Sequence, residues 1–146
     1  MSYTDFLYHI VFGTKDHVPF IAGSFENELY RYLGGIVKNH GGETIEINGM
    51  PDHVHLLVRL GPVGSISDLM RELKSSSSRW ARREHQPKFG WQRRYGAFTV
   101  SRSASNSVRE YIRRQKEHHR VKTFEDEYKD LLRTHNIEFD ERYLWD

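Results

Sequence analysis

Apolar and polar residues alternate along several stretches of the chain, and this pattern predicts the strands. The alternation is clear over residues 43–48 and 53–60, which are separated by turn-forming residues at 49–52. Aromatic and β-branched residues dominate residues 6–12 and 95–101. Such patterns are typical of half-buried strands, so we expect four strands, the middle two forming an antiparallel hairpin.

Between and after these strands, apolar residues recur at helical spacing. One helix is expected from Ser24 to the glycines at residues 41–42, since glycine tolerates the conformation at a helix end. A second helix is expected after Ser65, where the sequence resembles a capping box. A third is expected over residues 103–119 and a shorter one over residues 124–134.

The order of these elements is strand, helix, strand, strand, helix, strand, followed by a helical C-terminus. This order predicts an α+β protein with a ferredoxin-like or RRM-like βαββαβ antiparallel sheet. We expect helices on one face of the sheet and a C-terminal helix that carries Tyr111. The length favours a single domain over residues 1–146, with a core at 1–102 and the tyrosine helix and tail at 103–146.

Composition narrows the class of protein. The hydrophobic fraction of 37% is sufficient for one core, and no apolar run approaches the roughly 20 residues needed to cross a bilayer. The first residues carry no signal-like pattern. The chain has no cysteine, which excludes disulfides and thiolate metal sites. From these features we expect a cytoplasmic protein.

Charge is unevenly distributed. Residues 1–70 carry 4 basic and 8 acidic residues, whereas residues 71–102 carry 9 basic and 2 acidic ones. The basic segment interleaves cations with aromatic rings, a combination that suits phosphates and unpaired bases, although a solvated helix face would also explain the charge. The candidate DNA-binding residues are Arg79, Arg82, Arg83, Lys88, Trp91, Arg93 and Arg94.

Two histidines on one expected strand are the clearest candidate for chemistry. Side chains alternate along a strand, so His53 and His55 point to the same face, while Val54 and its apolar neighbours point to the other. Two imidazoles about 7 Å apart on one strand can converge on a metal ion. The alternative interpretation is a pair of surface histidines on a solvated sheet.

Tyr111 and Gln115 could complete such a site. They lie four residues apart on an expected helix and therefore share a face. The amide oxygen of Gln115 is an acceptable hard metal ligand. The hydroxyl of Tyr111 could attack a phosphorus atom whose oxygen a metal polarises. The alternative interpretation is an ordinary amphipathic helix.

Together these residues resemble the HUH endonucleases, in which two histidines flank a hydrophobic residue, here His53-Val54-His55. The chain is most similar to the single-tyrosine transposases of the IS200/IS605 type, including the REP-associated tyrosine transposases. The similar stretches cover nearly the whole chain. They are Tyr8-His9-Ile10-Val11-Phe12 with Thr14-Lys15, Asn48 to Val58, Ser65-Ile66-Ser67, Leu73-Lys74, Trp91-Gln92, Tyr95 to Phe98, Tyr111-Ile112 to Gln115 with His118-His119, and Tyr143-Leu144-Trp145.

The resemblance implies that His53, His55 and Gln115 hold a divalent metal, Mg²⁺ or Mn²⁺. It implies that Tyr111 forms a 5′-phosphotyrosine link to cleaved single-stranded DNA and that the released 3′-hydroxyl later reverses the attack. It also implies recognition of DNA hairpins and a homodimer in which Tyr111 acts in cis or in trans. No membrane partner is expected.

Two other functions are compatible with the sequence. A non-enzymatic RRM-like nucleic-acid-binding protein, derived from a transposase, would bind hairpins without metal. A metal-dependent phosphodiesterase that activates water would tolerate Tyr111→Phe. The metal is also open, since imidazoles favour transition metals whereas phosphoryl chemistry and cellular abundance favour magnesium.

Overall fold

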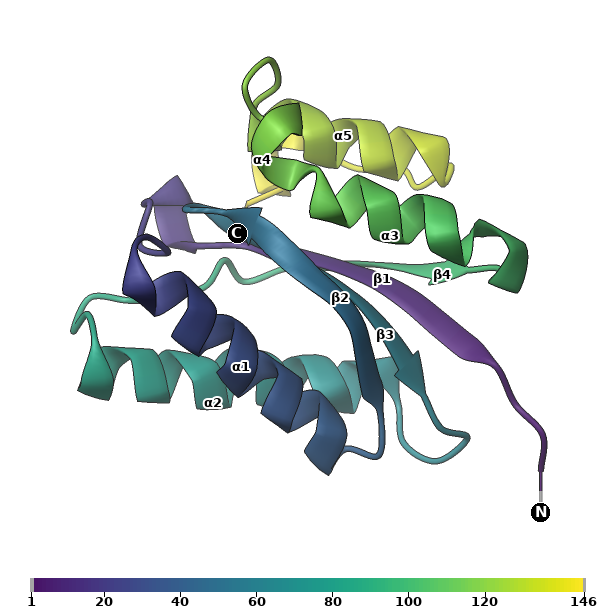
Figure 1. The fold of residues 1–146 in the computed structure, drawn as a ribbon. Helices are drawn as coiled ribbons and strands as arrows, with labels where there is room; N and C mark the ends of the chain where they lie inside the picture. The colour runs from purple at the N-terminus through teal and green to yellow at the C-terminus, as the bar shows by residue number, and fades with distance from the viewer. Residues whose placement is uncertain (1, 146) are drawn as a thin grey trace.

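The computed structural model describes residues 2–145, so the outermost residues of the expected 1–146 domain, Met1 and Asp146, lie outside the described residues. A four-stranded antiparallel sheet in the order β2-β3-β1-β4 forms its centre (Figure 1). The strands are β1 (Phe6–Gly13), β2 (Glu43–Met50), β3 (His53–Leu60) and β4 (Gly96–Val100). This is the predicted ferredoxin-like arrangement, in which the two central strands come from different βαβ halves.

Helices α1 (Ser24–Asn39) and α2 (Ile66–Glu84) cover one face of the sheet (Figure 1). Their apolar stripes meet Val54, Leu56 and Val58 of β3 in the larger core cluster. The side chain of Ser65 accepts a hydrogen bond from the Asp68 backbone N–H, as the capping box predicts. The alternating pattern of β3 therefore leaves His53 and His55 for the opposite face.

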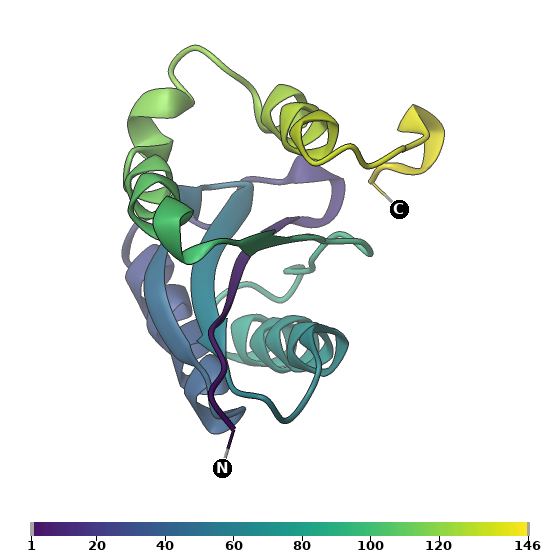
Figure 2. The same ribbon diagram turned by 90° about the vertical axis from the view of Figure 1, so that its right-hand side faces the viewer.

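That opposite face is covered by the C-terminal helices α3 (Ser105–Arg113), α4 (Gln115–His118) and α5 (Phe124–Thr134) (Figures 1 and 2). Short 3-10 segments at Lys15–His17, Arg102–Ala104 and Glu141–Tyr143 complete the elements. A smaller apolar cluster holds α5 against β1 and β4. Its buried members are Val11, Phe98, Phe124, Tyr128, Leu132 and Leu144. The sheet is thus sandwiched between two helical layers.

The prediction of one continuous helix over residues 103–119 is wrong, because the structure has two helices there, α3 and α4. The division lies at Arg114, which has φ −91° and ψ 14° and separates α3 from α4. The side-chain amide of Asn48 donates to the carbonyl oxygens of Ile112 and Arg113, each at 3.0 Å. The last carbonyls of a helix need hydrogen-bond partners from outside the helix. Asn48 of β2 supplies one, and so stabilises the C-terminal end of α3 at Arg113.

The alternation expected for β2 is also interrupted. A bulge between Thr44 and Glu46 shifts the register with β3. Ile47 packs on the larger core cluster, whereas Ile45 lines a pocket with Arg59 and Arg109. An inserted residue in a bulge changes the face that its neighbours meet, so the two isoleucines do not share a side.

Within the part of the chain that is described, no helix combines the length and the apolar character that crossing a membrane would require.

Candidate active site

His53 and His55 of β3 face the C-terminal helices and are fully buried. Their ring centroids lie 5.1 Å apart. The predicted shared face is therefore confirmed. The alternative of two solvated surface histidines is wrong, because α3, α4 and α5 cover this face of the sheet (Figure 2).

The Nδ1 atom of each histidine has its own partner. His53 Nδ1 lies 2.7 Å from the Asp52 carboxylate, in the turn that precedes β3. His55 Nδ1 lies 2.8 Å from Nε2 of His9 on the neighbouring strand β1. A partner on one ring nitrogen fixes the tautomer and the ring orientation, which leaves both Nε2 atoms for the centre of the site.

Tyr111 and Gln115 reach the same centre from the opposite side. The Tyr111 hydroxyl donates to Oε2 of Glu127 on α5, and the Tyr111 ring centroid lies 5.8 Å from that of His55. Gln115 is fully buried, and its Oε1 lies 3.1 Å from His53 Nε2. The structure thus brings the four residues singled out from the sequence together within one chain.

Two further side chains lie in this centre. Glu127 was not predicted from the sequence, and His119 was noted there only as one of two imidazoles near the site, with a polar helix end as the alternative. Glu127 Oε1 lies 3.0 Å from His55 Nε2 and 3.2 Å from His53 Nε2, and its side chain is only 1% exposed. His119 Nε2 lies 3.0 Å from the same oxygen. The sequence held one signal for Glu127, since it is a carboxylate between Phe124 and Tyr128 on the apolar stripe of its helix.

Burial and hydrogen bonding shift the protonation of these groups in different directions. Burial alone would raise the pKa of Glu127, but hydrogen bonds from His119, His53 and His55 outweigh it and lower the pKa. Burial lowers the pKa of His55 to about 4. Burial would also lower the pKa of His53, but hydrogen bonds to Asp52 and Glu127 raise it above the ordinary value. Glu127 is therefore ionised at neutral pH.

Tyr111 is protonated in this arrangement. Burial, followed by the charge of Glu127, raises the pKa of Tyr111 above that of a free phenol. A nucleophilic tyrosine would need a positive charge close by to offset both effects.

The donors in the centre fit a divalent metal ion. One ligand atom from each of His53, His55, His119 and Glu127 lies within 4.8 Å of all the others. Imidazole nitrogens and carboxylate oxygens are ordinary ligands of manganese and related metals. The oriented Nδ1 contacts match the second layer of hydrogen bonds found around metal-bound histidines.

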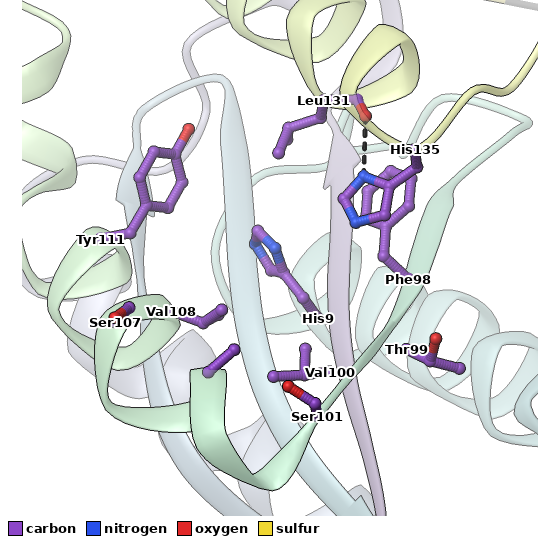
Figure 3. Close-up of a pocket in the computed structure, with 11 residues that line it drawn as sticks. His9, Phe98, Thr99, Val100, Ser101, Ser107, Val108, Tyr111, Leu131 and His135 are labelled. Carbon is purple, nitrogen blue, oxygen red and sulfur yellow. Dashed lines mark hydrogen bonds between the residues drawn. The ribbon is translucent and has the colours of Figure 1, made fainter.

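A pocket of about 560 Å³ opens beside this centre, between β4, α3 and the end of α5 (Figure 3). Tyr111 and His9 line its wall toward the centre, and Val108 of α3, about one turn before Tyr111, also lines the pocket. His135 stacks on Phe98 with ring centroids 4.3 Å apart on the far side. The pocket gives the tyrosine side of the site access to solvent.

Most of the candidate DNA-binding residues lie away from this centre. Arg79, Arg82 and Arg83 are exposed on α2, which covers the opposite face of the sheet. A pocket of about 520 Å³ adjoins this helix. Its basic lining residues are Lys15, Arg71, Lys74, Arg82, Lys88 and Arg93. Arg94 is exposed in the segment before β4.

Trp91 is a correction to that candidate set. Its side chain is only 9% exposed, packs edge-on against Phe12 with centroids 4.5 Å apart, and donates through Nε1 to Ser77. Trp91 forms part of the wall of the pocket beside α2, but an indole that packs in the core with a satisfied N–H has little exposed area for base stacking.

Known proteins are similar to this chain in sequence and in fold. The family model described as "Transposase IS200 like" matches residues 2–115. The ISDra2 transposase TnpA of Deinococcus radiodurans is 30% identical over 115 residues, which cover 74% of this chain and 82% of that protein.

Two solved structures have the same overall fold. A Deinococcus radiodurans R1 protein assigned as a transposase has a TM-score of 0.64 at 27% identity, and the match covers 78% of this chain and 93% of that one. A REP-associated tyrosine transposase bound to a REP hairpin has a TM-score of 0.65 at 14% identity, covering 82% of this chain and 72% of that one.

Proposed function

The chain belongs to the IS200-like transposase family, and from this membership we propose that it nicks single-stranded DNA and transfers the strand through Tyr111. One observation carries the proposal. The Tyr111 hydroxyl lies in the same buried cluster as His53, His55 and Gln115, all from a single chain. A nucleophile beside a metal-binding set is the arrangement that phosphoryl transfer requires.

The reaction conserves the energy of the phosphodiester bond. The Tyr111 oxygen attacks the phosphorus atom and loses its proton, the bond from phosphorus to the 3′ oxygen breaks, and that oxygen takes up a proton. The 5′ phosphate stays on Tyr111. Attack by a 3′-hydroxyl on this phosphotyrosine rejoins the strand and returns the proton to Tyr111, so strand transfer needs no external energy source.

In this proposal His53, His55 and Gln115 hold a divalent ion, Mg²⁺ or Mn²⁺. When bound, the ion supplies Lewis-acid polarisation of the phosphate and offsets the effects that keep Tyr111 protonated. Asp52 and His9 act on the histidines by holding their Nδ1 atoms. The basic segment of the chain supplies the attraction for the DNA backbone.

We further propose a DNA hairpin as the substrate feature that is recognised. The REP-associated relative was solved with a REP hairpin, and exposed arginines of α2 lie on the face of the sheet opposite the candidate site. A stem bound on the α2 side would leave the flanking single strand to pass around the sheet to Tyr111. The homodimer implied by the family stays a prediction.

The test is covalent capture of DNA. Wild type is expected to give a protein-linked band on a denaturing gel after incubation with hairpin-bearing single-stranded DNA labelled at its 3′ end and Mn²⁺, and to give none in EDTA. Tyr111→Phe should lose the band and cleavage while keeping its DNA affinity, because one hydroxyl contributes little binding area. Tyr143→Phe, which is exposed and away from the centre, is the matched control.

Three outcomes would contradict the proposal. Cleavage by Tyr111→Phe would favour a phosphodiesterase that activates water. Tight hairpin binding by wild type with neither cleavage nor adduct would favour the non-enzymatic nucleic-acid-binding protein. A protein-linked band of equal strength in EDTA would remove the metal from the mechanism.

A further inference from the structure

The centre of the site contains two side chains from beyond residues 2–115, the part of the chain that the family model matches. His119 directly follows α4, and Glu127 lies in the first half of α5. Figure 2 shows α5 lying beyond the loop that follows α4, over the same face of the sheet. The C-terminal segment therefore contributes groups to the centre as well as covering it.

His119 is oriented in the same way as the two histidines of β3. Its Nδ1 lies 2.6 Å from the backbone carbonyl oxygen of Lys122, so this nitrogen donates and the other faces inward. Its Nε2 lies 3.0 Å from Oε1 of Gln115 and 3.0 Å from Oε1 of Glu127. The three imidazoles thus share one arrangement, in which Nδ1 has a hydrogen-bond partner and Nε2 is turned to a common point.

The neighbouring His118 lacks these features. Its side chain is 32% exposed, compared with 5% for His119, and its Nε2 lies 3.7 Å from the nearest oxygen of Glu127. Orientation toward the centre is therefore specific to His119 rather than a general property of histidines at this helix end.

Glu127 supplies the negative charge that such a centre needs. Its Oε1 lies 3.0 to 3.2 Å from the Nε2 atoms of three histidines. Two atoms that bind one ion at about 2.1 Å lie about 3.0 to 3.4 Å from each other. The observed separations of this oxygen from the nitrogens fall in that range.

We propose that His119 and Glu127 are metal ligands that the C-terminal segment adds to His53, His55 and Gln115. The inference rests on the proposed metal use and deepens it. Glu127 Oε2 accepts hydrogen bonds from the Tyr111 hydroxyl and from the Gln115 amide. One carboxylate therefore binds the ion through one oxygen and positions the nucleophile through the other, so metal binding and the docking of α5 are coupled.

Direct measurement of Mn²⁺ binding to the metal-stripped full-length chain tests this. Isothermal titration should show one Mn²⁺ per chain, with a Kd at least about ten-fold weaker in Glu127→Gln and in His119→Asn, as the loss of a ligand entails. The controls are Glu125→Gln, an exposed carboxylate on the same helix, and His118→Asn, and both should stay within about two-fold of wild type. Circular dichroism in EDTA verifies that each variant is folded.

Pulsed EPR of the bound Mn²⁺ provides a readout that does not depend on affinity. Nitrogen couplings should indicate three coordinated imidazoles in wild type and two in His119→Asn. Two imidazoles in wild type, or unchanged Mn²⁺ affinity in folded Glu127→Gln and His119→Asn, would overturn the inference. If either result is found but His53→Ala and His55→Ala abolish Mn²⁺ binding, the proposed metal site stands without His119 and Glu127 as ligands. Absence of Mn²⁺ binding to wild type would overturn both.

Discussion

At the scale of single residues, the geometry of the site depends on the hydrogen-bond partner at Nδ1 of each histidine ring. His53, His55 and His119 each turn Nε2 inward because Asp52, His9 and the Lys122 carbonyl occupy Nδ1. The histidine pair could be predicted from strand alternation alone. His9 and Asp52 could not be assigned as its partners, because the register that brings β1 against β3 is a tertiary feature.

Glu127 shows the other limit of prediction at this scale. A carboxylate on an apolar stripe is visible in the sequence, but its partners come from residues up to 74 positions earlier in the chain, and no local pattern names them. Trp91 is the opposite case, a residue that the sequence offered as a functional candidate and that is structural. Its position beside arginines suggested base stacking, but its side chain belongs to the core.

The buried neutral imidazole of His55 predicts a pH dependence of stability in the metal-free chain. Its pKa is about 4 when folded and near its usual value when unfolded, so the unfolded state binds more protons between these two pH values. As pH falls from about 6.5 to about 4, wild type should therefore lose stability relative to His55→Asn, by at most about 1.4 kcal/mol per pH unit.

Urea unfolding in EDTA at several pH values measures this difference. His40→Asn, an exposed histidine at the end of α1, is the control and should follow wild type. A wild-type stability that runs parallel to that of His55→Asn over this pH range would show that His55 is not held neutral.

At the scale of elements, the positions of the strands and helices could be predicted from the sequence, whereas the places where they are interrupted could not. The periodicity predicted all four strands, α1, α2 and α5 to within a few residues. The break at Arg114 depends on Asn48, a side chain of β2 that binds the carbonyls of α3. The bulge in β2 depends on pairing with β3. Both are set by contacts between distant segments, which a periodic pattern does not encode.

The docking of α5 depends on a glycine in β1. A Cβ atom at Gly13 would lie 2.6 Å from the Phe124 ring and 2.6 Å from Oε1 of Gln92. Phe124 in turn stacks on His53 with centroids 4.0 Å apart. Gly13→Ala is therefore expected to displace the start of α5 and to reduce the free energy of unfolding by about 1 to 3 kcal/mol.

The matched control is Gly35→Ala in the exposed part of α1, where a Cβ would meet nothing within 4 Å. That change should be neutral or stabilising by up to about 1 kcal/mol, since alanine is the better helix former. Urea unfolding gives both free energies, and hydrogen exchange of α5 peptides reports the docking. Wild-type stability and protection in Gly13→Ala would contradict the proposed packing.

At the scale of the whole molecule, charge and chemistry lie on different faces of the sheet. The candidate site is under α3, α4 and α5, and the arginines of α2 are on the other side (Figure 1). This separation follows from two predictions made from the sequence, a helical layer on one face of the sheet and a pair of histidines on the strand face opposite Val54, Leu56 and Val58.

This separation predicts that hairpin binding and cleavage can be weakened independently. The triple variant Arg79→Ala, Arg82→Ala and Arg83→Ala should bind a hairpin more weakly and lower the slope of log K against log salt by about 2 to 3. Its cleavage rate at saturating DNA should stay near that of wild type. The control Arg133→Ala and Arg142→Ala, which changes two exposed arginines of the C-terminal segment, should keep the wild-type slope, whereas equal slopes for all three proteins would exclude a role for α2.

The central claim is that Tyr111 becomes covalently linked to DNA, and mass spectrometry of the trapped adduct tests it most directly. After digestion with nuclease and trypsin, the added nucleotide mass should lie on the peptide of residues 110–113, attached to Tyr111 through a 5′ phosphate. Nucleotide mass on another tyrosine, or complete cleavage of the DNA with no modified peptide, would contradict the account.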